Sequence, residues 1–309
     1  MEQNKIPVVL ASDGNQIHAM ATVMTSAVIN ANSDTFYDFY CLISSDVTET
    51  QRGYLKACAD IRQNCSVNLV DMDEYFKNIQ YSHNNFTHSI TTATLFRLKV
   101  PSVLTNLDKV LYIDTDILVR GDLAELYNMP IGNAYLAGVP AVWAHANRKD
   151  REKWLTRTGI PDMDYYINAG VIIMNLKEMR ADDIEKKCFD LIGYEKFKGL
   201  DGDQLILNYT CYGRIAFMPC RYNVTASNIK HFERMRVVFS GKEIREAVEN
   251  PTIIHWTGAG KPWRYYDVLL AHEWWRYYKM SPYKDVPLHR ESNSDNYKKF
   301  RSILKKLFH

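Results

Sequence analysis

Short runs of consecutive apolar residues alternate along the chain with segments of helical periodicity. The runs at residues 6–11, 39–43 and 67–70, the last interrupted by Asn68, have the length of strands. Between them, apolar side chains recur at helical spacing through residues 20–28 and then 48–58. Strands that alternate with helices predict crossover units and a mostly parallel sheet. Because the runs are continuous rather than alternating, we expect helices to cover both faces of that sheet.

Three further runs of the same kind come later in the chain. They occupy residues 110–113, 171–174 and 252–254. After Trp263 the sequence becomes aromatic and irregular, and neither an internal repeat nor a glycine- and serine-rich linker divides the chain. We therefore predict one α/β domain at residues 1–265, followed by an aromatic and basic C-terminal segment at residues 266–309.

The composition excludes several classes of protein. Of the 309 residues, 46% are hydrophobic and 24% are charged, which is typical of a soluble globular chain. The 38 basic and 36 acidic residues leave a net charge of +2, too balanced for a nucleic-acid-binding protein. The six cysteines form no Cys-x-x-Cys pair, so free thiols in a reducing compartment are expected. No apolar stretch approaches the ~20 residues that span a bilayer, and no secretory signal opens the sequence, so we expect a cytoplasmic protein.

Polar residues follow three of the predicted strands directly. They are Asp13 and Asn15 after the first run, Asp114 and Asp116 after the run at 110–113, and His255 after the run at 252–254. In an open α/β sheet, ligands bind at the carboxyl ends of parallel strands. We therefore expect these side chains to lie at one binding edge.

The pair Asp114 and Asp116 is the strongest candidate for a metal site. Two residues apart on extended backbone, both carboxylates project to the same side. They repel one another unless a cation or a shared proton lies between them. Oxygen ligands suit Mg²⁺ or Mn²⁺, and an imidazole such as His255 favours Mn²⁺. The alternative interpretation is a solvated turn with two surface aspartates.

Two segments could contact an anionic or polar ligand through their backbone. Gly258 and Lys261 lie in a glycine-containing loop that could hold a phosphate, although Pro262 excludes a Walker loop and a plain turn is the alternative. Asn168 and Ala169 come just before a predicted strand, where small residues leave room for a ligand beside the backbone.

Three further side chains stand out in otherwise apolar surroundings. Arg97 lies near the centre of a predicted helix at residues 93–100, and a surface arginine is its alternative interpretation. Asp203 and Gln204 pair a carboxylate with an amide, and their alternative is an ordinary helix N-terminus capped by Asp201 or Asp203.

Seven short motifs that include these candidates follow one another along the chain. They are residues 11–15 (ASDGN), 88–90 (HSI), 94–98 (TLFRL), 109–116 (KVLYIDTD), 168–171 (NAGV), 203–204 (DQ) and 255–263 (HWTGAGKPW). In this order they resemble glycosyltransferase family 8, the retaining galactosyl- and glucosyltransferases, including bacterial enzymes of lipooligosaccharide synthesis. The resemblance covers residues 6–263 and implies the GT-A fold, a Rossmann-like, mostly parallel sheet flanked by helices.

The resemblance implies a role for each candidate. Mn²⁺, which Mg²⁺ could replace, would be ligated by Asp114, Asp116 and His255. Gln204, Asp203 and Asp116 would be catalytic, with Gln204 against the anomeric carbon. A UDP-sugar donor would contact Ala11, Asp13, Asn15, His88, Arg97, Asp114, Thr115, Asn168, Ala169, Gly258 and Lys261. Among these, Asp13 and Asn15 would hold the uracil and ribose, and Lys261 with the Gly258 amide would hold the departing phosphate.

Two departures from the family pattern bear on the mechanism. Retention usually signals a carboxylate nucleophile, but the residue expected at that face is Gln204, a poor nucleophile that can stabilise positive charge. Many family members have an aspartate where this chain has Leu205, so we predict front-face substitution rather than double displacement. Residues 139–142 lack an aspartate found in related galactosyltransferases, so galactose and glucose both stay open as the donor hexose.

The last residues form a basic amphipathic segment. At residues 297–309, five apolar side chains recur at helical spacing and five basic side chains fall on the other face. Such a helix suits an anionic membrane surface, while packing on the protein itself is the alternative. Because the family commonly acts on lipid-linked saccharides, the resemblance favours attachment to the inner face of the cell membrane.

Three other functions share the same motifs. A glycogenin-like protein would glucosylate one of its own tyrosines, of which there are 20. A nucleotidyltransferase would use similar metal–diphosphate chemistry, but no glycine-rich basic loop near the N-terminus supports it. A non-catalytic UDP-sugar-binding protein would keep the binding residues without turnover.

Overall fold

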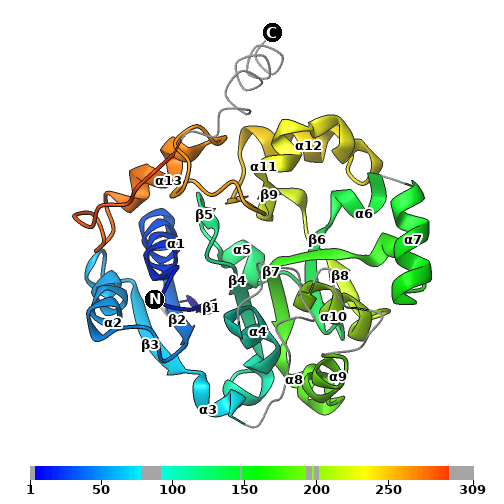
Figure 1. Cartoon of the computed structure of the whole chain (residues 1–309), viewed down its shortest axis with the longest axis horizontal. Coiled ribbons are helices and arrows are strands. Elements are labelled where there is room, and N and C mark those ends of the chain that lie inside the picture. Colours follow the sequence, from blue (N-terminus) through cyan, green and yellow to red (C-terminus); the bar gives the residue numbers. More distant parts are fainter. Residues whose placement is uncertain (1–3, 78–91, 147, 193–196, 198–201, 292–309) are drawn as a thin grey trace.

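A seven-stranded sheet forms the centre of the computed structural model (Figure 1). The structure describes all residues except 1–3, 78–91, 147, 193–196, 198–201 and 292–309. In spatial order the strands are β3 (Cys65–Asp71), β2 (Thr35–Ile43), β1 (Asn4–Ser12), β4 (Lys109–Ile113), β7 (Ile167–Asn175), β6 (Leu136–Pro140) and β8 (Ile215–Phe217). The predicted α/β fold with a central, mostly parallel sheet flanked by helices is confirmed.

Consecutive residues of the central strands enter two different hydrophobic cores. In β1, Val8 and Leu10 belong to one cluster and Val9 to the other, and all three are fully buried. Adjacent side chains of a strand point to opposite faces of its sheet. The continuous apolar runs therefore arise because helices cover both faces, as the pattern predicts.

The helices form two layers, one for each core. Against the cluster that contains Val8 pack α1 (Ile17–Asn30), α2 (Glu49–Lys56), α5 (Ala124–Tyr127), α11 (Ala226–Lys230), α12 (Gly241–Glu249) and α13 (Ala271–Tyr278). Against the cluster that contains Val9 pack α3 (Asp73–Phe76), α4 (Thr92–Val103), α7 (Arg148–Thr158), α8 (Leu176–Ala181), α9 (Ile184–Asp190) and α10 (Gly202–Thr210). The short helix α6 (Val142–Ala146) contributes to both. Among the described residues, none of these helices has the length and apolar character needed to cross a bilayer.

The strand β7 corrects the expectation that the run at residues 171–174 resembles the earlier, parallel ones, within a sheet that is mostly parallel as predicted. It pairs antiparallel with β4 on one side and with β6 on the other, whereas β1, β2, β3 and β4 run parallel. An apolar run reports that a strand is buried but not the direction in which it runs. As a result, the start of β7, with Asn168, lies at the same sheet edge as the carboxyl ends of β1 and β4.

A second correction concerns the predicted strand at residues 252–254. In the structure it is β10 (Ile253–His255), which lies in a separate three-stranded sheet between β5 (Ile117–Val119) and β9 (Val224–Thr225). It runs antiparallel to β5, with His255 opposite Ile117. Its closing histidine therefore reaches the binding edge through this small sheet rather than through the main one.

The segment after Trp263 packs on the N-terminal half of the chain. Helix α13 lies beside α1 (Figure 1), where Asn30 donates a hydrogen bond to the hydroxyl of Tyr277. Residue Tyr265 forms a β-bridge with Glu291. The division of the chain at residue 265 stays a prediction, and the amphipathic segment at 297–309 lies outside the described residues.

A buried histidine joins α1 to this C-terminal segment. The ring of His18 forms T-shaped contacts with Trp263, Trp274 and Tyr283, whose ring centroids lie 5.7, 6.4 and 6.4 Å away. Its Nε2 atom is buried and has no hydrogen-bond partner within the described part of the chain. Burial lowers the pKa of His18 to about 4. The fold therefore requires the neutral imidazole.

We expect acid to destabilise the protein through this residue. In the unfolded chain the imidazole of His18 has a pKa of about 6.5. The contribution of His18 to the free energy of unfolding is therefore complete above that pH and decreases as the pH falls toward 4. Between pH 7 and 5 the loss is about 2 kcal/mol. Urea unfolding at both pH values should show this loss in the wild type but not in His18→Gln. The exposed His272 supplies the control, because His272→Gln should keep the wild-type loss; equal losses in all three proteins would disprove the linkage.

Candidate active site

The two aspartates form the turn between β4 and β5. The backbone N–H of Asp114 donates to the carbonyl of Gly170 on β7 at 2.8 Å. The side chains of Asp114 and Asp116 are 23% and 16% exposed. These values argue against a solvated turn with two surface aspartates.

The pairing of β5 with β10 brings His255 to this turn. Because Ile117 lies opposite His255, Asp116, which comes directly before Ile117, is a neighbour of the imidazole. The Nε2 atom of His255 lies 3.1 Å from Oδ1 of Asp116. Three residues each offer one possible ligand atom here, and these three atoms lie within 4.8 Å of one another: Asp114, Asp116 and His255. The structure thus assembles the three predicted metal ligands.

A glycine on β7 makes room for this cluster. A Cβ atom on Gly170 would lie 2.3 Å from Cε1 of His255 and 2.8 Å from Oδ2 of Asp114. Contacts this short do not occur between real side chains, so no other residue fits here without moving the cluster. The space beside the Gly170 backbone is therefore filled by the imidazole and the carboxylate.

Arg97 is buried at the centre of an ion-pair network. It is 6% exposed, and its guanidinium contacts Oδ1 of Asp114, Oδ2 of Asp203 and the carbonyl of Ala169, each at 2.7 Å. Burial alone would lower the pKa of Arg97, but Asp114 and Asp203 raise it above its usual value. The interpretation of Arg97 as a surface arginine is wrong. Asp203 does lie in the first turn of α10, as expected, but its carboxylate pairs with Arg97.

Gln204 holds the same stretch of β7 from the other side. Its Oε1 accepts a hydrogen bond from the backbone N–H of Ala169 at 2.9 Å. Both backbone polar groups of Ala169 are thus engaged, the N–H by Gln204 and the carbonyl by Arg97. The structure brings these residues together with Asp114 and Asp203.

The predicted nucleotide-binding residues lie at the end of β1. Val9 of β1 pairs with Tyr112 of β4, so Ala11 is level with Asp114 at the sheet edge. In the following turn, Oδ1 of Asp13 accepts the backbone N–H of Asn15 at 3.0 Å. The predicted donor contact His88 lies outside the described residues.

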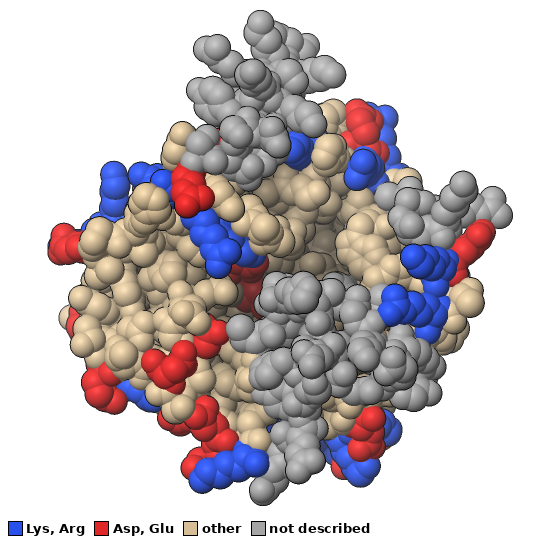
Figure 2. Space-filling view, in the orientation of Figure 1, with Lys and Arg blue, Asp and Glu red and all other residues tan. Residues whose placement is uncertain are grey.

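Lys261 contacts the metal-ligand cluster directly. Its ammonium donates to Oδ2 of Asp116 and to the carbonyl of Trp256, the latter at 2.7 Å. Burial alone would raise the pKa of Asp116, but His255 and Lys261 hold it well below its usual value. Gly258, earlier in the same loop, adopts the left-handed conformation with φ +74°. In the space-filling view, acidic and basic atoms meet on the wall of a hollow near the centre of one face (Figure 2).

Comparison with known proteins gives one consistent result. Residues 7–267, most of the chain, match the profile of Glycosyl transferase family 8. The chain belongs to this family. It is 26% identical over 299 residues to the lipopolysaccharide 1,2-glucosyltransferase of Escherichia coli K12, covering 94% of this chain and 83% of that protein. It is also 26% identical to glycosyltransferase GlyE of Streptococcus pneumoniae over 280 residues, which cover 90% of this chain but only 62% of GlyE.

Solved structures share the fold of this family 8 chain. The galactosyltransferase LgtC, solved with donor and acceptor sugar analogues, superposes with a TM-score of 0.74 at 24% identity, covering 91% of this chain and 98% of LgtC. The bifunctional glycosyltransferase WbbM gives a TM-score of 0.78 at 22% identity, covering 96% of this chain and 51% of WbbM. The fold is the GT-A fold of glycosyltransferases.

The cluster fits the divalent metal that GT-A glycosyltransferases use. Two carboxylates and an imidazole are a donor set that can bind a divalent cation. Oδ1 of Asp116 is buried and has no hydrogen-bond donor among the described residues, although it faces His255. Because Gly170 has no side chain, the imidazole of His255 and the carboxylate of Asp114 can both lie against its backbone, close to one another. Chemistry and geometry therefore agree with a family 8 metal site.

The sequence interpretation misses one residue of this site, Asn223. Its side chain bridges His255 and Asn168, with distances of 2.8 and 2.7 Å. It is 2% exposed and follows the short 3₁₀ helix at Cys220–Tyr222. No local pattern marks it, because it lies 32 residues before His255 and its neighbours suggest only a turn.

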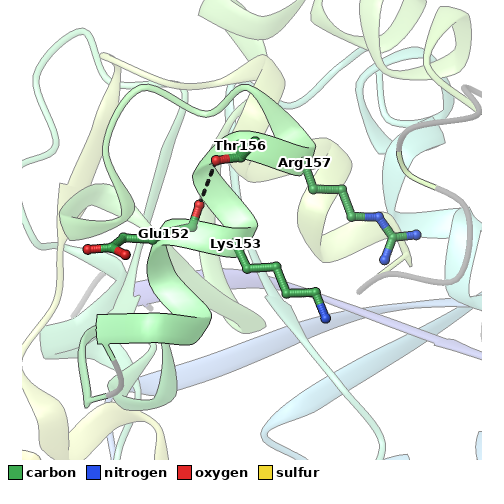
Figure 3. A pocket seen from close by; sticks show the side chains of 4 residues that line it. All are labelled: Glu152, Lys153, Thr156 and Arg157. Carbon is green, nitrogen blue, oxygen red and sulfur yellow. Dashed lines mark hydrogen bonds between the residues drawn. The ribbon is translucent and has the colours of Figure 1, made fainter.

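An open cavity of about 560 Å³ lies at the surface beside α7. It is lined by Glu152, Lys153, Thr156 and Arg157, which all come from this one helix (Figure 3). The side chains of Lys153 and Arg157 extend from the helix on the same side. None of the predicted donor or metal residues that the structure describes is among these four, so the metal site rests on its contacts rather than on cavity shape.

Proposed function

We propose that the chain is a retaining hexosyltransferase that moves galactose or glucose from a UDP-sugar to a saccharide acceptor. The observation that carries this proposal is the cluster of Asp114, Asp116 and His255, with Lys261 beside it. Family membership supports the transferase reaction. The lipopolysaccharide glucosyltransferase among its relatives supports a lipid-linked, cell-surface glycan as the acceptor.

Asp114, Asp116 and His255 would hold Mn²⁺, or Mg²⁺ in its place. When bound, the cation supplies positive charge to the diphosphate of the donor as that group departs. Lys261 adds a second fixed positive charge on the same side, and Arg97 holds Asp114 in position from the other side. Fixed charges of this kind stabilise a transition state without further reorganisation.

The residues around the proposed donor sugar support front-face substitution. The acceptor oxygen would bond to the anomeric carbon as the bond from that carbon to the UDP oxygen breaks, and the acceptor proton would pass to the leaving phosphate. Gln204 is neutral and Asp203 is held by Arg97, so neither is a free carboxylate nucleophile. Leu205 is fully buried in the core and supplies none. Double displacement therefore lacks a nucleophile among these residues.

The test is UDP release from UDP-galactose and UDP-glucose, each with Mn²⁺ or with EDTA. Release with one donor, dependent on the metal, would support the class and identify the hexose. Tight UDP–Mn²⁺ binding without release from either donor would favour the non-catalytic alternative. Stepwise growth of the intact protein mass by hexose units, without added acceptor, would favour the glycogenin-like alternative.

We also propose that residues 297–309 attach the enzyme to the cytoplasmic face of the membrane. Five basic side chains and no acidic ones occur in this segment. Each basic residue near an anionic surface contributes about 1 kcal/mol of attraction. We expect the full chain to sediment with phosphatidylserine-containing liposomes at low salt and to be released at high salt. Deleting 297–309 should abolish sedimentation; unchanged binding would exclude the segment as the attachment.

A further inference from the structure

The amide of Asn223 connects the proposed metal site to the start of β7. Its Nδ2 donates to Oδ1 of Asn168 at 2.7 Å, and its Oδ1 lies 2.8 Å from Nδ1 of His255. The residue comes directly before β9, which runs parallel to β10 with Thr225 opposite His255, and the side chain of Asn223 reaches the imidazole from two residues away. Two elements far apart in the sequence therefore meet through one buried amide.

One backbone group determines which atoms donate and which accept in the hydrogen bonds that link Asn168, Asn223 and His255. The N–H of Gly170 can only donate, and it donates to Oδ1 of Asn168 at 3.0 Å. The same oxygen faces Asn223, so Asn223 must present its NH₂ group there. Its carbonyl oxygen then faces His255, whose Nδ1 must carry the hydrogen. This assignment is set by the network of donors and acceptors.

A hydrogen on Nδ1 of His255 determines the state of the other ring nitrogen, Nε2. A neutral imidazole that is protonated on Nδ1 has a lone pair on Nε2, which faces Oδ1 of Asp116 at 3.1 Å. Two acceptors then face one another, an arrangement that a divalent cation stabilises. Histidines that bind metals usually hold their tautomer through such a partner on the second ring nitrogen.

We propose that Asn223 is a positioning residue for the metal centre: it fixes His255 as the Nδ1–H tautomer and so directs Nε2 to the cation. This inference rests on the proposed metal site, whereas the hydrogen bond between Asn223 and Nδ1 of His255 is made by the protein alone. Through Asn168, the same amide ties the orientation of His255 to a predicted donor-sugar contact.

The first experiment measures the tautomer in the metal-free protein. With ¹⁵N-labelled histidine, the ring resonances of His255, assigned with a His255→Gln variant and followed up the pH scale until the ring is neutral, should show the hydrogen on Nδ1. Asn223→Leu, which is similar in size but accepts no hydrogen bond, should shift the ring toward the Nε2–H form. Asn223→Asp loses the donor to Asn168 but keeps an acceptor for Nδ1–H, so the hydrogen should stay on Nδ1. An unchanged tautomer in the leucine variant would overturn the proposal.

The second experiment measures Mn²⁺ binding by electron paramagnetic resonance, without nucleotide or turnover. We expect Asn223→Leu to bind Mn²⁺ about 10–100-fold more weakly, because the ligand loses its partner. Asn223→Asp should bind close to wild type. Asn30 provides the matched control, because its amide bonds to Ser26, Val119 and Tyr277 and to none of the ligands. Asn30→Leu should lose stability but keep wild-type affinity.

These outcomes separate the inference from the proposed function. Wild-type affinity in a folded Asn223→Leu would overturn the inference while leaving the metal site in place. If Asn223→Leu fails to fold, the tautomer in the aspartate variant decides, because a hydrogen on Nε2 in folded Asn223→Asp would contradict a role as acceptor. If the wild type itself binds no Mn²⁺, the proposed metal site fails and the tautomer measurement alone judges Asn223.

Discussion

Replacing Asp116 with asparagine should lower metal-dependent UDP release by about 10³-fold or more. The substitution keeps the shape of the side chain but removes the charge that His255 and Lys261 both face. A bound metal stabilises transition-state charge by several kcal/mol, and about 4 kcal/mol corresponds to a 10³-fold change in rate. Initial rates at saturating Mn²⁺, with whichever donor the wild type uses, measure the effect.

Asp122 provides a control of the same residue type close by in the chain. Its carboxylate accepts the backbone N–H groups of Asn32 and Ala124 at 2.8 and 2.7 Å, so its contacts are structural. Asp122→Asn should reduce stability slightly and leave the rate near wild type. An Asp116→Asn enzyme that keeps metal-dependent release within tenfold of wild type would exclude Asp116 as a required ligand.

Replacing Lys261 with methionine should have opposite effects on turnover and on metal binding. Methionine keeps most of the side-chain length without its charge. Removing one fixed donor to a developing oxyanion costs about 10²–10³ in rate, and we expect a loss of that size in UDP release. Without nucleotide, however, the ammonium competes with a cation for Asp116, which it contacts directly. Mn²⁺ should therefore bind more tightly to the variant than to wild type.

Initial rates and Mn²⁺ titration by electron paramagnetic resonance test the two effects separately. Lys242, which is exposed on α12, supplies the control, and Lys242→Met should change neither quantity. Weaker Mn²⁺ binding in Lys261→Met would disprove competition at Asp116. An unchanged rate would remove Lys261 from the proposed diphosphate contacts.

The local sequence pattern was sufficient to locate the central strands and the aspartate pair. Consecutive apolar residues such as Val8, Val9 and Leu10 can all be buried only if both faces of a strand are covered. This follows from the alternation of side chains between the two faces of a strand, which can be recognised in the local sequence alone. The carboxylates that follow β4 lie at its carboxyl end whatever the strand pairs with, so the candidate metal ligands could be named before their surroundings were known.

Only the tertiary structure decided how the site is completed. Arg97 meets Asp203 and Ala169, which are 106 and 72 residues away, and it proved to be buried rather than a surface side chain. The pattern could not show this, because a single arginine in a helix has the same local sequence in either environment. Its burial depends on which carboxylates the fold brings to it.

The sequence by itself thus located β1, β2, β3, β4, β7 and β10, the carboxylates that follow β4, and the family to which those motifs point, but not the short buried strands β5 and β6. The tertiary structure decided the direction of β7, the placement of β10 in a second sheet, and the bridge that Asn223 makes between His255 and Asn168. The physical reason is the range of each signal. Burial leaves a period of two or 3.6 residues in the local sequence, whereas strand pairing and hydrogen-bond partners depend on residues far away along the chain.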